Sequence, residues 1–226
     1  MKIPLSNRLL ACCGFVRPGD RVADVGCDHG YLGIHLLLSR VARSVIASDV
    51  NQGPLDSARR NAEKYGVREN IVFCLSDGVQ NIPKDFDTMV CAGMGADTMI
   101  SILSAAPWLK SPQYRLILQC QSKTPTLRRY LTDQGYRICR ETLAQDGKFI
   151  YPIMEVEYQP GSEMNEAQCY LSPALLESGS ELLIPYANRI LGGLRETVAG
   201  LSASGGPVYE QKLQLIGQLE SMLELS

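Results

Sequence analysis

The sequence predicts an α/β fold with a mainly parallel sheet covered by helices, followed by a helical segment. Between residues 21 and about 106, short Val/Ile-rich runs alternate with helix-like segments, an order typical of a parallel sheet. Asp146-Gly147 then stands between two strand-like runs, which indicates a hairpin. Beyond Gln159, apolar residues recur at helical spacing, which indicates amphipathic helices.

The parallel part is expected to contain strands at 22–24, 44–48, 71–75, 88–91 and 115–118 and helices at 31–39, 54–65, 97–105 and 126–134. The second helix has a start signal in Asn51 and Pro54 and a stop in Gly66, and Gly135 ends the fourth. Strands at 138–144 and 149–157 form the hairpin. A parallel sheet that ends in an antiparallel hairpin is the usual outline of Rossmann-like class I methyltransferases, whereas NAD-binding domains normally have a parallel sixth strand.

The chain is expected to divide into a Rossmann-like domain at 1–160 and a helical domain at 161–226. Pro160-Gly161-Ser162 marks the break, and residues 184–201 and 208–225 predict an antiparallel, coiled-coil-like helical pair, with a breaker at 202–207. This pair is either a structural or oligomerising appendage or a substrate-binding one. The sequence does not determine the oligomeric state, for which a monomer is the expectation.

Composition predicts a soluble protein without a membrane span or a metal site. No apolar run approaches the roughly 20 residues of a membrane helix. The eight cysteines are scattered without a C-x-x-C pair, which disfavours zinc and favours free thiols in the cytoplasm. Net charge is +3 over residues 1–160 and −5 over 161–226, so charge alone neither requires nor excludes a nucleic-acid partner.

The most distinctive local feature is a strand that runs into a glycine-bounded turn, from Asp24 through Gly26 and Asp28 to Gly30. Such a turn lets a ligand approach backbone amides at a helix start. A dinucleotide fingerprint would need glycine in place of Asp28, whose carboxylate would repel a pyrophosphate. S-adenosylmethionine has no phosphate and carries an amine and a sulfonium, so acidic groups favour its binding.

Two further aspartates follow successive strands. Asp49 ends the second strand, 23 residues after Gly26, where a carboxylate can accept ribose hydroxyls. Asp77 follows the third strand and is suited to an adenine amino group, with Gly78 allowing the ring to approach. Each could instead cap a turn. Together they converge on the crevice at the carboxyl ends of the strands, which favours cofactor binding.

The chain resembles the TrmK family of bacterial tRNA adenine-22 N1-methyltransferases along its whole length. The resemblance rests on Leu5-Ser6-Asn7-Arg8-Leu9, residues 24–32, Ala92-Gly93-Met94-Gly95 and residues 146–151. It implies an S-adenosylmethionine cofactor, a tRNA substrate, a helical pair that helps to grip tRNA, and Asp28 as the catalytic residue. The chain departs from the family pattern at Cys120-Gln121, where Pro-Asn is expected, and in its acidic tail.

The expected site has three groups of residues. The cofactor-binding candidates are Asp24, Gly26, Cys27, Gly30, Asp49, Val50, Asp77, Gly78 and Gly93. The substrate-binding candidates are Arg8, His29, Tyr31, Met94 and Gln119, with Tyr151 as a further wall of the base pocket. The basic residues considered for RNA phosphates are Arg8, Arg17, Lys123, Arg128, Arg129, Arg137, Arg140 and Lys148.

Methylation of N1 leaves the adenine cationic, so a carboxylate near N6 stabilises the product charge and can accept a proton. Asp28 suits that role, with contact to the cofactor amine as the alternative. N1 lies on the Watson–Crick edge, so the base must leave the stack before reaction. A small-molecule or protein methyltransferase, with the helical pair as lid or dimer interface, is the second hypothesis, and a non-catalytic cofactor-binding module in an RNA complex is the third.

Overall fold

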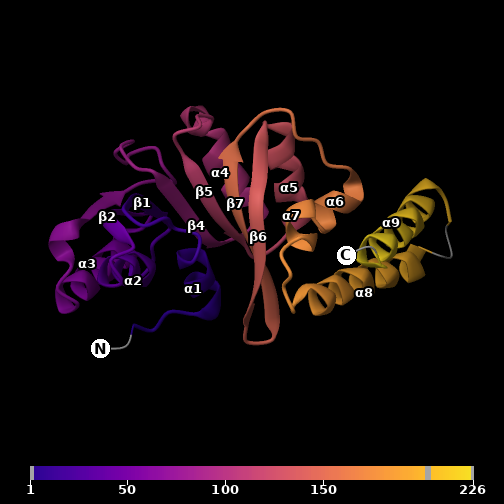
Figure 1. Cartoon of the computed structure of the whole chain (residues 1–226), viewed down its shortest axis with the longest axis horizontal. Coiled ribbons are helices and arrows are strands. Elements are labelled where there is room, and N and C mark those ends of the chain that lie inside the picture. The colour runs from indigo at the N-terminus through magenta and orange to yellow at the C-terminus, as the bar shows by residue number, and fades with distance from the viewer. Residues whose placement is uncertain (1–2, 202–204, 225–226) are drawn as a thin grey trace.

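A seven-stranded sheet forms the centre of the molecule in a computed structural model that describes residues 3–201 and 205–224 (Figure 1). The strand order is β3-β2-β1-β4-β5-β7-β6. The strands are β1 (Asp20–Val25), β2 (Ala42–Asp49), β3 (Ile71–Leu75), β4 (Thr88–Met94), β5 (Arg115–Cys120), β6 (Tyr136–Asp146) and β7 (Phe149–Tyr158). The first five strands are parallel, and β7 is antiparallel to both β5 and β6. The predicted mainly parallel sheet with a terminal hairpin is therefore confirmed.

Helices cover both faces of this sheet. Their bounds are α1 (Asn7–Cys13), α2 (Tyr31–Leu38), α3 (Gln52–Lys64), α4 (Ala96–Ser104) and α5 (Thr124–Asp133). One hydrophobic cluster joins the sheet to α1, α2 and α3, and a second joins it to α4 and α5. Within β1, Val22 belongs to the first cluster and Ala23 to the second, because successive side chains of a strand point to opposite faces. The central strands are consequently buried on both sides, which accounts for their apolar composition, whereas β3 at the edge of the sheet exposes Val72 and Leu75.

The helix α1 was not among the elements expected from the sequence. It packs against α2 and the strands β4, β5, β6 and β7. Leu5, Leu9, Cys12, Cys13 and Val16, whose spacing is that of one helical face, all pack in its hydrophobic cluster. The helical spacing of these apolar residues was therefore visible in the sequence. Their packing holds α1 beside the carboxyl ends of the central strands.

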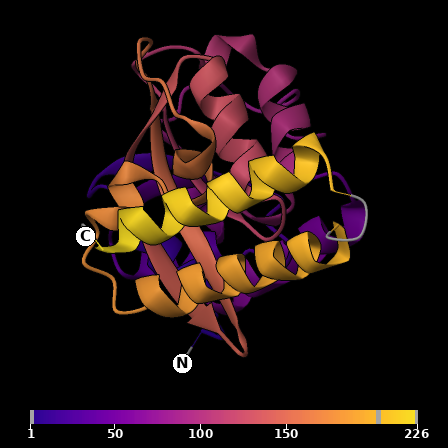
Figure 2. The same ribbon diagram turned by 90° about the vertical axis from the view of Figure 1, so that its right-hand side faces the viewer.

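Four helices follow the sheet: α6 (Glu166–Tyr170), α7 (Pro173–Leu176), α8 (Leu183–Leu201) and α9 (Pro207–Glu224). The long pair, α8 and α9, was predicted and runs antiparallel (Figure 2). Positions 202–204 and 225 of that prediction lie outside the described residues. A third hydrophobic cluster holds the pair together with α6, α7 and Leu143 of β6. Within the described residues, no helix is long and apolar enough to cross a membrane.

A buried ion pair fastens α5 to the segment that follows the sheet. The Arg128 guanidinium is fully buried and bonds the Glu141 carboxylate, which also accepts from the Ser172 hydroxyl. Arg128 further donates to the carbonyl oxygens of Cys169 and Tyr170, at 2.8 and 2.7 Å. The expectation that Arg128 contacts RNA phosphates is therefore wrong, because its charge is neutralised in the interior and has no access to solvent.

Candidate active site

The carboxyl ends of β1, β2, β3 and β4 surround a pocket of about 380 Å³. The structure brings nine expected site residues to its wall: Arg8, Gly26, Asp28, Asp49, Val50, Asp77, Gly78, Gly93 and Met94. A smaller adjoining cavity of about 90 Å³ shares Arg8, Gly26 and Asp28 and is also lined by Asp24, Cys27, His29 and Tyr31. Gly30 and Gln119 line neither cavity.

The turn between β1 and α2 is held by the end of β2. The amides of Gly26 and Cys27 both donate to the Ser48 carbonyl, at 2.8 and 2.9 Å. Gly26 has a φ of +72°, and a Cβ there would stand 2.3 Å from the Met94 methyl carbon. Glycine therefore serves both the turn and the close approach of Met94. Gly30 serves packing instead, since a Cβ there would meet the Ala58 Cβ at 2.9 Å.

Asp28 stands at the mouth of the site in the left-handed conformation, with φ +48°. Its side chain is 72% exposed, and its Oδ1 lies 3.7 Å from His29 Nε2. A carboxylate this exposed has little role in packing. It is free to meet a molecule that arrives from solvent.

Asp49 is fixed by backbone amides. Its Oδ1 accepts from the Asn51 amide at 2.9 Å and its Oδ2 from the Asp28 amide at 3.3 Å. The turn-capping role left open by the sequence is thus realised. A carboxylate has about four acceptor positions, so each oxygen keeps capacity for a ligand hydroxyl. Asp49 is a pre-oriented acceptor in the pocket wall.

Asp24 is an unusual buried carboxyl group. Burial raises its pKa to about 7, and the nearby negative charge of Asp49 contributes to this rise. Its Oδ2 is buried without a hydrogen-bond partner, beside the smaller cavity. An orphaned acidic oxygen of this kind fits a cationic or amine donor, and it does not fit a phosphate.

The far end of the pocket suits a flat ring that carries an amino group. Val50 is 62% exposed, an unusual position for an apolar side chain, and Ile102 lies in the same pocket. The exposed Asp77 supplies an acceptor at this end. Gly78 has φ +56°, and a Cβ there would stand 2.9 Å from Ile102. The lining therefore fits S-adenosylmethionine, with acceptors for its amine, ribose and adenine. The cation in the pocket wall, Arg8, is paired with Asp146 rather than free for a phosphate.

Arg8 of α1 spans the mouth of the site. Its Nη1 donates to Gln119 Oε1 at 2.9 Å, and its Nε lies 3.3 Å from Asp146 Oδ2 in the hairpin. The same Gln119 oxygen accepts from the Gly93 amide at 3.0 Å. Gln119 is fully buried, so the structure gives it the task of orienting Arg8 and β4 rather than direct contact with substrate. Asp146 was expected as a turn residue and as part of the motif at 146–151, and its pairing with Arg8 had no local signal.

Two of the arginines proposed for RNA contact lie at the opposite edge of the sheet. Arg17 pairs with Glu157 at 3.2 Å, and Arg140 pairs with Glu155, near the amino end of β5. Both arginines lie away from the crevice and are paired with carboxylates, and their contact with RNA stays a prediction. Lys123 is exposed near the crevice but is paired with Asp97 at 2.6 Å. Lys148, in the tip of the hairpin, has no carboxylate partner among the described residues.

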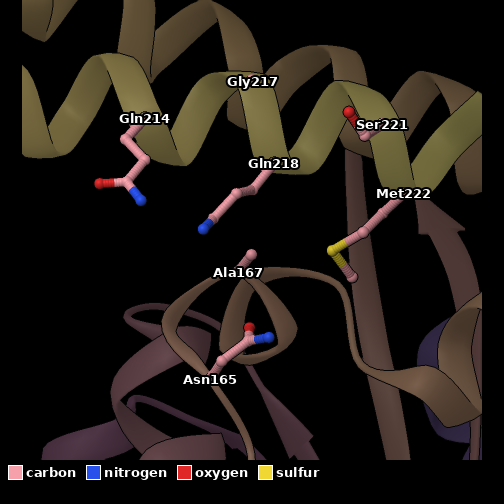
Figure 3. A pocket seen from close by; sticks show the side chains of 7 residues that line it. All are labelled: Asn165, Ala167, Gln214, Gly217, Gln218, Ser221 and Met222. Atoms are coloured by element: carbon pink, nitrogen blue, oxygen red, sulfur yellow. The ribbon is translucent and has the colours of Figure 1, made fainter.

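Another hollow, of about 460 Å³, lies between α6 and α9 (Figure 3). Gln214 and Gln218 of α9 point toward Asn165 and Ala167, with Ser221 and Met222 further along the helix. Its lining contains the Ser221 hydroxyl but no His, Lys, Asp, Glu or Cys side chain that could act as an acid or base beside it. The described residues also contain no cluster of three or more His, Cys, Asp or Glu side chains able to hold a metal ion.

The Rossmann-like sheet with its antiparallel hairpin, together with the acidic pocket at the carboxyl ends of the strands, is that of the S-adenosylmethionine-dependent methyltransferases. In agreement, the family described as "Methyltransferase domain" matches residues 5–154. The Bacillus subtilis tRNA (adenine(22)-N(1))-methyltransferase is 31% identical over 157 residues, 69% of this chain. The sequence alignments span 66% and 61% of the first two curated relatives' own lengths.

Solved structures extend the likeness to the whole chain. The crystal structure of Bacillus subtilis TrmK, described as an m1A22 tRNA methyltransferase, has a TM-score of 0.81 at 26% identity, over 99% of this chain and 97% of that one. A Streptococcus pneumoniae protein solved with S-adenosyl-L-methionine has a TM-score of 0.85 at 26% identity, over 97% and 99%. The chain belongs to the TrmK family of methyltransferases.

Proposed function

We propose that this protein transfers a methyl group from S-adenosylmethionine to N1 of adenine 22 in tRNA. The observation that carries the proposal is the convergence of Asp49, Asp77 and the exposed Asp28 on one pocket at the carboxyl edge of the sheet. Relatives that match across most of the chain act on this tRNA position by their names.

The cofactor assignments follow the geometry of the wall. Asp49 would accept the ribose hydroxyls, Asp77 the adenine amino group, and the orphaned oxygen of Asp24 the amine end. Gly26, Gly78 and Gly93 have positive φ values and let the backbone come close to a ligand. Val50 supplies an apolar face for the adenine ring.

When bound, S-adenosylmethionine supplies a methyl group activated by its sulfonium. The protein must then hold the adenine N1 in line with that methyl, which is mainly a problem of positioning. The N1 lone pair needs no strong base. Asp28, at the mouth, would stabilise the positive charge that develops on the ring and accept the N6 proton. Met94, Tyr31 and His29 are the proposed walls for the base.

The remaining assignments extend the proposal to the whole molecule. Most buried residues of the third hydrophobic cluster come from the helical part at 161–226, with Leu143 of β6 joining it to the catalytic part at 1–160, which supports the two-domain division. Action on tRNA as a monomer in the cytoplasm agrees with the absence of a membrane-spanning helix among the described residues and with eight free cysteines.

Methylation of two transcripts tests the proposal. A tRNA transcript with adenine at position 22 should gain one N1-methyladenine per molecule, whereas the same transcript with guanine there should gain none. Nucleoside analysis by mass spectrometry gives the product. Equal methylation of both transcripts, or turnover of small metabolites or protein without tRNA turnover, would refute the assignment of substrate.

A further inference from the structure

A groove of about 690 Å³ lies beside the cofactor pocket, between the sheet and α8. It includes Gly95, which follows Met94 of the cofactor pocket along the chain. The loop between β5 and α5 and the start of β7 form one wall, and α8 forms the other. Its polar and aromatic lining includes Lys123, Phe149, Tyr151, Tyr170, Arg189 and Thr197.

The charge of this groove contrasts with that of the helical segment. Residues 161–226 carry three basic and eight acidic side chains, yet no acidic residue lines the groove. Two of the three basic side chains are paired, Arg195 with Glu220 at 2.6 Å and Lys212 with Glu166 at 3.2 Å. In the described part of the chain, Arg189 has no carboxylate partner. The unpaired cation of the helical segment is therefore the one that faces the groove.

An aromatic side chain stands beside this cation. The Arg189 guanidinium carbon lies 4.9 Å from the Phe149 ring centroid, and Lys148 Nζ lies 5.3 Å from it. Phe149 remains 37% exposed, and the Tyr151 ring is 6.0 Å away. An exposed ring between unpaired cations is the combination that binds single-stranded nucleic acid, because the ring stacks on a base while the cations neutralise the phosphates.

The position of the groove fits the geometry of the reaction. An adenine whose N1 enters the cofactor pocket has left its stack, so its neighbours in the strand are exposed as well. We propose, building on the proposed function, that the groove binds a nucleotide adjacent to the target adenine, with Phe149 stacked on its base and Arg189 against its phosphate. The helix α8 thereby reads RNA through one face, although the segment as a whole is acidic.

The proposed contact between Arg189 and a phosphate is tested with two arginines on the same helix. Arg189→Gln and Arg195→Gln each remove one positive charge, but only Arg189 lines the groove. Binding of an adenine-22 tRNA transcript is measured by fluorescence anisotropy across a salt series. The slope of log affinity against log salt should fall by about 0.7–0.9 for Arg189→Gln, the loss of one phosphate contact, and stay unchanged for Arg195→Gln.

The proposed stacking of a base on the Phe149 ring is tested by replacing Phe149. Phe149→Leu should weaken binding of the transcript roughly five- to hundredfold, whereas Phe149→Tyr should retain it. A transcript with an abasic site at position 21 or 23 should remove the difference between leucine and phenylalanine, and one with an abasic site in the anticodon should not. The affinity for S-adenosylhomocysteine, measured by calorimetry, should be the same in all variants and verifies that they fold.

The outcomes separate this inference from the proposed function. If the two arginine variants behave alike and Phe149→Leu binds normally, while the wild-type enzyme methylates the transcript, the groove assignment is wrong and the function stands. If Arg189→Gln alters self-association in sedimentation without altering tRNA affinity, the groove is an interface between copies and the inference is also wrong. A wild-type protein that neither binds nor methylates the transcript refutes both.

Discussion

Replacing Asp28 by asparagine tests the chemistry assigned to the mouth of the pocket. The side chain is 72% exposed and its Oδ1 lies 3.7 Å from the His29 imidazole, so its loss should change the free energy of unfolding by less than about 0.5 kcal/mol. Its φ of +48° matters for the choice of variant. Asparagine and glycine tolerate this conformation, whereas alanine would add about 1–2 kcal/mol of backbone strain.

The expected effect is on the chemical step. Removal of one group that stabilises transition-state charge costs about 10²–10³ in rate, or about 2.7–4 kcal/mol. Single-turnover methylation of the adenine-22 transcript at saturating cofactor isolates this step from binding and product release. Asparagine keeps an acceptor for N6 without the charge, and glycine removes both. A similar loss in both variants indicates charge stabilisation or proton acceptance, and a loss in glycine alone indicates positioning.

A proportional fall in S-adenosylhomocysteine affinity and rate would refute this reasoning. Asp28 would then contact the cofactor amine instead of the target base. Unchanged single-turnover rates in both variants would remove Asp28 from the reaction altogether. Calorimetric titration of the same protein samples distinguishes the two results.

Three further predictions concern aspartates and the buried arginine. Asp49→Ala should weaken S-adenosylhomocysteine binding by about 1–3 kcal/mol in calorimetry, because two ribose hydroxyls lose their acceptor, whereas the exposed Asp56→Ala should leave it unchanged. Arg128→Met should lower the free energy of unfolding in denaturant titration by about 3–5 kcal/mol, since Glu141 is left buried without its partner; a loss under 1 kcal/mol would contradict this. The pKa of Asp24 is raised from 3.8 to about 7, so the folded protein binds the extra proton and stability should fall as pH rises from about 4 to 7. Asp24→Asn should flatten that fall in the cofactor-free protein. If the melting temperatures of the two proteins change equally with pH between 4.5 and 8, burial of Asp24 has no such effect.

The sheet and its carboxyl-edge aspartates were predictable because their signals are local. Each parallel strand is built on a short run of apolar residues. Asp49 is the last residue of β2, and Asp77 comes two residues after the end of β3. Parallel strands align their carboxyl ends, so position along the chain alone determines that these carboxylates meet. The turn at Gly26 was predictable for the same reason, because the positive φ of Gly26 is a local property of the turn.

The unpredicted features depend on partners that are distant in the sequence. Gln119 was expected to contact substrate, but its oxygen is bonded to Arg8, 111 residues earlier in the chain. Arg128 is a basic residue and was therefore a candidate for contact with RNA phosphates. Only its buried pairing with Glu141 reveals a structural role. The short helices α6 and α7 carried local capping signals at Asn165 and Ser172 that were not used. The helix α6 bonds to Arg128, and Ser172 at the start of α7 bonds to Glu141. A truncation that isolates the helical pair should therefore begin near Leu183 rather than at residue 161.

The link from Arg8 to Asp146 has a consequence for biosynthesis. The mouth of the pocket joins the first helix of the chain to a hairpin made 138 residues later, as the bond from Asn7 to the Gln145 carbonyl shows directly. On a ribosome, β1 to β4 emerge well before that hairpin, so the nascent chain contains the cofactor aspartates without the element that closes over them. Cofactor affinity on stalled nascent chains of increasing length therefore reports when the hairpin docks, and it should rise only after Asp146 has left the exit tunnel.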